Sequence, residues 1–126
     1  QLEAARVVGI KEVVFLGHPD GGLEDNQELR REVVREIRRL QPDIVICQDP
    51  YRRGHNHRDH RIAGQVAFDS CYPYARDYHH FPELTSEGFM PHKVAEIYAM
   101  GSDDPSIYVG ISETIDIKIE ALKGGC

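Results

Sequence analysis

A periodic helix followed directly by an apolar strand, over residues 25–48, limits the fold more than any other feature. Four apolar residues repeat at helical spacing, Leu29, Val33, Ile37 and Leu40, and Pro42 ends the pattern. The run DIVICQD that follows is apolar on both faces, as is typical of a buried strand in a parallel sheet. A β-branched run, KEVVFLG at 11–17, precedes the helix. Strand, helix and strand within about forty residues predict a right-handed βαβ unit.

The remaining segments continue this alternation. We expect helices over residues 1–9, from Asp59 onward and over ETIDIKIEALK at the end of the chain. We expect strands over KVAEIYAM (93–100) and SIYVGIS (106–112). The irregular segment 72–92, rich in Pro, Tyr and His, is expected to form a lid or a surface excursion. The order predicts one α/β domain over residues 1–126, a Rossmann-like three-layer fold with a mainly parallel sheet.

The charged residues of the helix predicted from Asp25 to Leu40 indicate a face exposed to solvent. Asp25 and Glu28 have the spacing of a capping box at its start. Glutamates alternate with five arginines at spacings of three or four, which suits exposed ion pairs. The arginines are Arg30, Arg31, Arg35, Arg38 and Arg39.

Composition excludes two classes of function. The formal net charge is −6, which argues against a nucleic-acid-binding domain. No apolar run approaches the roughly 20 residues that a membrane span requires.

The three cysteines show no CxxC spacing, which argues against a disulfide framework and a thiolate metal site. A reducing cytoplasm is the compartment that fits this cysteine usage.

The stretch GHNHRDHR, residues 54–61, follows the strand at 44–48 and is the candidate site. Loops after parallel strands are where open α/β sheets bind ligands. We expect His60 in the first turn of a helix, where the helix dipole favours the neutral imidazole that a metal needs. His57 could donate a proton or stabilise an oxyanion, and Asp59 could orient one ring. Spacing alone fits equally well a solvated loop in which Asp59 only caps the helix.

A second His-x-Asp pair occurs in the stretch GHPDGG. His18 and Asp20, together with His60, would make a His/Asp/His metal set. The competing interpretation is a turn, because Pro and Gly are turn formers and Gly21 stands where a second acidic residue would be needed. In that case the turn forms a wall of the substrate pocket.

The stretch GHNHRDHRIAGQ, after QPDIVICQDP, resembles the second signature of the PIG-L/LmbE-like deacetylases. These are zinc-dependent enzymes that remove acetyl groups from N-acetylglucosamine conjugates. The resemblance covers most of the chain. Three further stretches are similar to the family: AARVVGIKEVVFLGHPDG, LRREVVREIRRLQPDIVI and VGISETIDIKIEALK.

The resemblance implies a role for each residue of the His-x-Asp-His motif. His60 is similar to a zinc ligand, His57 to the histidine that acts as acid or oxyanion stabiliser, and Asp59 to the aspartate that supports the histidines. His55 and Asn56 match no role. The family's other signature, of the His-Pro-Asp-Asp-Glu type, supplies two more ligands and the general base. Nothing here corresponds to it, and we expect it upstream of Gln1.

The expected function is therefore zinc-dependent hydrolysis of an acetamide on an N-acetylglucosamine-linked small molecule, with Zn²⁺ as the cofactor. This chain alone is expected to be inactive. Neither a nucleic-acid partner nor a membrane span is expected, and the resemblance leaves a homo-oligomer open. The alternative is a non-catalytic sugar-binding or interaction protein with a vestigial metal loop.

Overall fold

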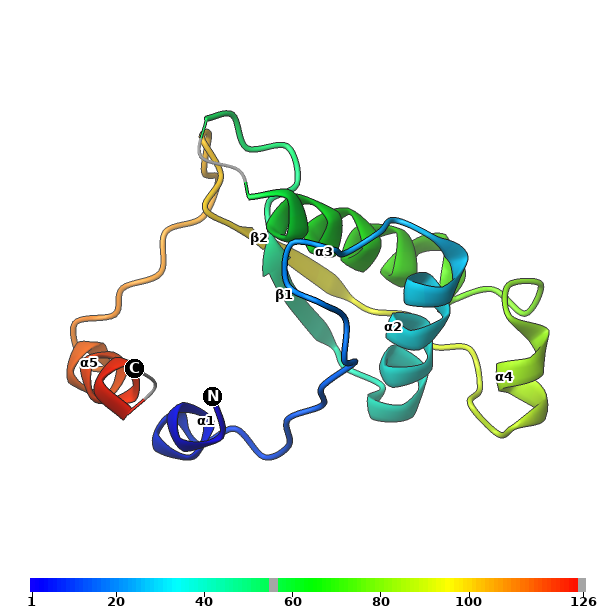
Figure 1. Cartoon of the computed structure of the whole chain (residues 1–126), viewed down its shortest axis with the longest axis horizontal. Coiled ribbons are helices and arrows are strands. Elements are labelled where there is room, and N and C mark those ends of the chain that lie inside the picture. The colour runs from blue at the N-terminus through cyan, green and yellow to red at the C-terminus, as the bar shows by residue number, and fades with distance from the viewer. Residues whose placement is uncertain (55–56, 125–126) are drawn as a thin grey trace. The chain divides into compact units, whose positions relative to one another are not determined.

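The computed structural model describes residues 1–54 and 57–124 (Figure 1). The chain divides into two compact units, which are described separately. The first unit comprises Gln1–Gly17 and Ser106–Cys126, and the second comprises His18–Pro105. The expectation of one domain over residues 1–126 stays a prediction.

Two helices that pack against each other form the first unit. α1 (Leu2–Val8) contacts α5 (Ile115–Gly124), and the buried residues are small, Ala5 in α1 and Ala121 in α5. Gly9 ends α1 in the left-handed conformation, with φ of 80°, which glycine adopts without steric cost. The helices predicted at both ends of the chain are confirmed.

Two parallel strands form the sheet of the second unit. β1 (Ile44–Gln48) pairs with β2 (Glu96–Met100) in a register that runs from Ile44 opposite Glu96 to Gln48 opposite Met100. α3 (Arg58–Asp69) lies between them in the chain and runs back across the sheet, as a parallel crossover requires. The prediction of an α/β fold with a parallel sheet is confirmed.

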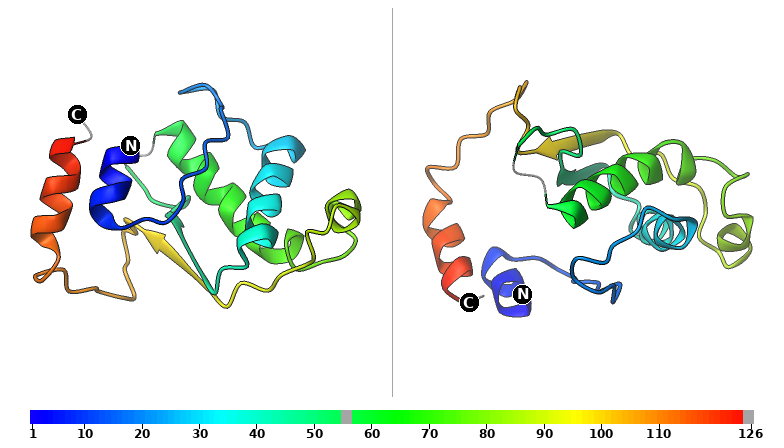
Figure 2. Two further views of the ribbon diagram at one scale, coloured as in Figure 1. Left: turned by 90° about the horizontal axis from the view of Figure 1, so that it is seen from below. Right: turned by 45° about the horizontal axis from the view of Figure 1, so that its top comes forward.

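α2 and α3 pack beside each other on one face of this sheet. Both views of Figure 2 show the cyan α2 (Gln27–Leu40) and the green α3 on the same side of the strands. The buried core comprises Val34, Ile37, Cys71, Ala75 and Leu84, and the sheet contributes Val45 and Ile97. A Cβ added to Gly64 of α3 would collide with the carbonyl oxygen of Gln48. Glycine therefore allows the backbone of α3 to lie directly on the end of β1.

The start of α2 differs by one residue from the predicted capping box. Asn26 is the N-cap, and its side chain accepts a hydrogen bond from the Leu29 amide at 2.9 Å. Asp25 instead lies 2.5 Å from Nη2 of Arg30. Asparagine and aspartate are comparably good caps, so the sequence alone did not decide between neighbouring candidates.

Two segments predicted to be strands are not strands in the structure. Residues 11–17 and 106–112 have no strand conformation, and the sheet within the described residues consists of β1 and β2. Their large side chains are exposed, with Phe15 at 60% and Tyr108 at 85%. A strand needs a neighbour that accepts and donates its backbone hydrogen bonds, and β-branched composition cannot supply one. The βαβ unit is therefore β1–α3–β2, and the unit predicted to begin at residue 11 is wrong.

Arg38 is buried, which corrects the prediction that every arginine of this helix is solvated. Its side chain is 2% exposed, because it lies four residues after Val34 on the inner face of α2. Burial lowers the pKa of its guanidinium. By contrast, Arg39 makes the expected exposed pair with Glu36, at 2.7 Å from Nε.

The guanidinium of Arg38 organises the segment that follows α3. It donates to six oxygens of this segment, within 2.8–3.4 Å. The acceptors are the carbonyls of Tyr74, Ala75, Asp77, His80 and Phe81 and the hydroxyl of Thr85. The segment contains the π-helical turn η1 (Ser70–Tyr74) and α4 (Pro82–Ser86). Because it is anchored to α2, we interpret it as a packed part of the second unit.

No helix in residues 1–54 and 57–124 is both long enough and apolar enough to cross a membrane.

Candidate functional site

The loops that leave β1 and β2 meet at the carboxyl edge of the sheet. The Asp49 amide donates to the Met100 carbonyl at 3.0 Å, which continues the pairing one step beyond the strands. The Arg53 amide then donates to Oδ2 of Asp103 at 2.6 Å. The loop after β1 carries the His-x-Asp-His motif, so this motif lies at the edge where open α/β sheets bind ligands.

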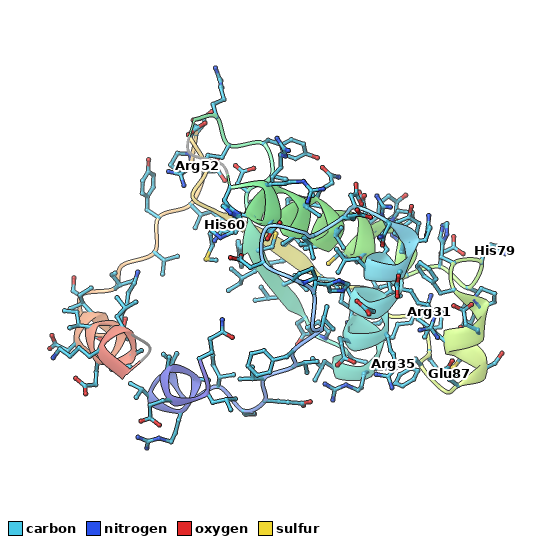
Figure 3. The ribbon with its side chains drawn as sticks, in the orientation of Figure 1. Arg31, Arg35, Arg52, His60, His79 and Glu87 are labelled. Atoms are coloured by element: carbon cyan, nitrogen blue, oxygen red, sulfur yellow. The ribbon has the colours of Figure 1, made fainter. Side chains whose placement is uncertain are left out.

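His57 and His60 lie together at the start of α3. Their ring centroids are 5.4 Å apart, and both residues are exposed. His60 is the third residue of α3 and therefore lies in its first turn, as predicted. Figure 3 shows His60 at the same end of the unit as Arg52, whereas His79 lies at the far end near α4. His55 and Asn56, which had no assigned role, lie outside the described residues.

His57 also caps α3. Its Nδ1 accepts a hydrogen bond from the Asp59 amide at 3.3 Å. The interpretation of Asp59 as the helix cap is therefore wrong. A ring nitrogen that accepts an N–H bond carries no proton, so this bond favours the tautomer with the proton on Nε2. In that form His57 presents an N–H donor on the other side of its ring.

The Asp59 carboxylate binds the turn at residues 18–23. Oδ2 accepts from the Gly21 amide at 2.6 Å, and Oδ1 accepts from the Leu23 amide at 3.2 Å. Arg58 reinforces this contact by donating to the Leu23 carbonyl. The motif thus joins two loops that are far apart in sequence, and the role of Asp59 in supporting the histidines stays a prediction.

His18 and Asp20 do not join the histidines of α3 in a metal site. Nε2 of His18 lies 2.6 Å from Oε2 of Glu32 in α2. In the part of the chain that the structure describes, no three His, Cys, Asp or Glu side chains form a group that could hold a metal ion. The structure therefore does not assemble the His18/Asp20/His60 set, although the turn itself lies against the His-x-Asp-His motif through Asp59.

The segment at residues 72–80, which follows α3 and is rich in Tyr and His, lies at the edge of the sheet opposite the His-x-Asp-His motif. A 12-residue helix such as α3 is about 18 Å long, so it ends far from His57. Two open pockets, of about 390 and 430 Å³, share Tyr72 as a lining residue. Neither pocket is lined by His57, Asp59 or His60. Tyr74 packs its ring edge-on against His80 at 4.6 Å, which is a packing role.

The described cysteines are not activated nucleophiles. Burial raises the pKa of the Cys71 thiol to about 12 and also raises the pKa of Cys47. Both are free thiols. Because the thiolate is the reactive form, neither sulfur is suited to attack a substrate near neutral pH. This agrees with the interpretation of Cys47 as a core residue.

Asp103 is the residue of this edge that the sequence did not single out. Asp103 and Asp104 precede Pro105 and read as turn residues. The position of Asp103 after a strand was the signal that could have identified it. Asp103 follows β2, just as the His-x-Asp-His motif follows β1. The carboxyl ends of paired parallel strands lie at the same edge of a sheet.

Replacing Asp59 with alanine is expected to release the turn at residues 18–23 from α3. The Gly21 and Leu23 amides lose their carboxylate acceptor, so their hydrogen exchange is expected to accelerate at least 10-fold, and the free energy of unfolding to fall by about 1–2 kcal/mol. Amide exchange followed by NMR measures both sites. The Asp20→Ala variant in the same turn is the control, and equal exchange in both variants would show that Asp59 does not hold the turn.

Comparison with known proteins gives a consistent set of similarities. The family model described as "PIG-L: GlcNAc-PI de-N-acetylase" matches residues 1–71, which is more than half of the chain. Diacetylchitobiose deacetylase of Thermococcus kodakarensis is 28% identical over 120 residues, which cover 95% of this chain and 45% of the relative. The chain therefore spans less than half the length of that relative.

Two solved structures share the fold. The N,N'-diacetylchitobiose deacetylase from Pyrococcus horikoshii superposes with a TM-score of 0.90 at 26% identity, covering 96% of this chain and 45% of that one. A conserved protein from Thermus thermophilus superposes with a TM-score of 0.78 at 28% identity, covering 96% of this chain and 52% of that one. These matches confirm the predicted fold type.

Proposed function

This chain belongs to the PIG-L family of de-N-acetylases, and we propose that the protein containing it removes the acetyl group from an N-acetylglucosamine-linked small molecule with the help of zinc. One observation carries the proposal. The two histidines of the His-x-Asp-His motif lie together, exposed, at the start of α3 and at the carboxyl edge of a parallel sheet. The names of two relatives, both diacetylchitobiose deacetylases, support the substrate class.

The residues present fit a partial zinc site. Imidazole nitrogen is a preferred ligand of zinc, and His60 is exposed in the first turn of α3. Catalytic zinc usually takes three protein ligands. The described residues offer no group of three. We therefore assign His60 as one ligand and expect the others outside the described residues.

The chemistry follows from the resistance of amides to hydrolysis. Water adds to the carbonyl carbon, the C–N bond breaks, and acetate and the free amine are the products. Bound zinc supplies a Lewis acid that polarises the carbonyl and lowers the pKa of water. His57 has its Nε2–H free to donate to the oxygen that gains negative charge, because its Nδ1 is engaged by the Asp59 amide. Passing a proton to the departing amine requires the ring of His57 to carry protons on both nitrogens, so Nδ1 must first release the Asp59 amide and take up a proton from solvent.

Asp59 fixes this arrangement through the backbone. Its amide holds His57, and its carboxylate holds the turn that contains His18 and Asp20. We propose that this turn forms a wall of the substrate pocket. The general base is not assigned in this chain, since the family pattern places it in the His-Pro-Asp-Asp-Glu-type signature.

The test is acetate release by the complete protein from a panel of N-acetylglucosamine conjugates, with zinc content measured by mass spectrometry. The proposal expects acetate from at least one conjugate and loss of activity after chelation, with recovery on adding zinc. Binding of the conjugates without acetate release would favour the alternative, a non-catalytic sugar-binding protein.

Two further attributes stay predictions. The free thiols of Cys47 and Cys71 support a reducing cytoplasm as the compartment. A homo-oligomer stays open, and sedimentation analysis of the complete protein decides it.

A further inference from the structure

The loop after β2 holds the loop that carries the His-x-Asp-His motif. Oδ2 of Asp103 accepts a hydrogen bond from the Arg53 amide at 2.6 Å, which is a short bond to a charged acceptor. Oδ1 of the same carboxylate lies 4.0 Å from Nε of Arg52. Both side chains of this ion pair are more than 40% exposed, so solvent screens it. The bond to the Arg53 amide is a short, charge-assisted contact between the loops.

The backbone around Asp103 is shaped for this contact. Gly101 follows β2 with φ of +77°, a conformation that other residues rarely adopt. A Cβ at Gly101 would also lie 3.3 Å from Nη1 of Arg52. Glycine thus lets the chain turn after β2 and approach the first loop closely, which brings Asp103 to the Arg53 amide.

We infer that Asp103 is a positioning residue for the zinc-binding and proton-donating histidines, an inference that rests on the proposed function. Arg53 lies four residues before His57, whose ring caps α3. The Asp103 carboxylate holds the loop after β1 at Arg53, and the cap holds His57 at the start of α3. Asp103 acts through the backbone of Arg53, and it is assigned no contact with substrate or zinc.

The experiment compares three variants of the complete protein: Asp103→Ala, Asp103→Asn and Asp104→Ala. Asp104 is the matched control, because its carboxylate makes no hydrogen bond or ion pair with the described residues. The readouts are amide exchange at Arg53, zinc affinity by competition with a chelator, and kcat and KM for acetate release. Melting temperature monitors stability separately.

We expect Asp103→Ala to accelerate exchange at Arg53 and to weaken zinc binding about 10-fold, the lower end of what supporting partners of metal ligands contribute. Asp103→Asn is expected to restore most of the affinity, because its carbonyl oxygen can accept the same N–H. Asp104→Ala is expected to match the wild type.

Two results would overturn the claims separately. If wild-type protein binds zinc and releases acetate, but Asp103→Ala does so with unchanged zinc affinity and kcat, the positioning role is wrong and the function stands. If the wild type neither binds zinc nor releases acetate, the proposed function is wrong, and the positioning role falls with it.

Discussion

The Arg38→Ala variant is expected to lose about 3–5 kcal/mol of the free energy of unfolding, a larger loss of stability than we expect from the Asp59 or Asp103 variants. The side chain is 2% exposed and donates to six oxygens of the segment after α3. Removing it leaves carbonyls without a donor and opens a cavity between α2 and that segment. Domains are stable by only about 5–15 kcal/mol, so such a loss threatens folding itself.

Urea denaturation followed by circular dichroism measures this effect. Arg35→Ala is the matched control on the same helix, because Arg35 is 42% exposed, pairs with Glu36 and lies over the Phe89 ring. Its loss is expected to cost about 1 kcal/mol or less. Arg38→Lys should also be clearly destabilising, since an ammonium cannot reproduce the planar fork of donors. Arg38→Ala within about 1 kcal/mol of the wild type would contradict the anchoring role.

The His60→Ala variant of the complete protein is expected to lose bound zinc and to release acetate at least about 100-fold more slowly than the wild type. His60 is exposed at the start of α3, so its removal leaves no cavity in the core. The melting temperature of the zinc-free protein should therefore stay unchanged. Elemental mass spectrometry and an acetate assay provide the two readouts.

His79→Ala is the control for this substitution. His79 is an exposed histidine at the far end of the second unit, away from His60 (Figure 3). Its replacement is expected to leave zinc content and acetate release unchanged. Wild-type zinc stoichiometry in His60→Ala would remove His60 from the set of ligands.

Apolar contacts of α2 could be predicted from the sequence, whereas the contacts of the buried Arg38 could not. The periodicity of Leu29, Val33 and Ile37 predicted α2, because a helix buries residues three and four apart. Arg38 fits the same inner face but was interpreted as solvated, since charged residues are seldom buried. Its acceptors lie 36–47 residues later in the chain, and they form a cluster only once that segment has folded.

The prediction of strands failed for two segments, because a strand requires a neighbouring strand with which to form backbone hydrogen bonds. The runs at 44–48 and 96–100 are strands because they pair with each other. The runs at 11–17 and 106–112 are also rich in β-branched and apolar residues, but they are not strands in the structure. Backbone hydrogen bonds between strands are not encoded in either strand alone.

The sequence by itself determined α1, α2, α3 and α5, the α/β class, the family and the position of the His-x-Asp-His motif after a strand, because these follow from local periodicity and short motifs. The tertiary structure alone decided that Asp59 holds a turn 36–38 residues away and that Asp103 holds a loop 50 residues away. Such contacts join polar groups across large sequence separations. The Asp103 contact forms only when the parallel pairing of β1 with β2 brings the loops that follow them to the same edge of the sheet. The Asp59 contact forms when α3 packs beside α2, which follows the turn at residues 18–23.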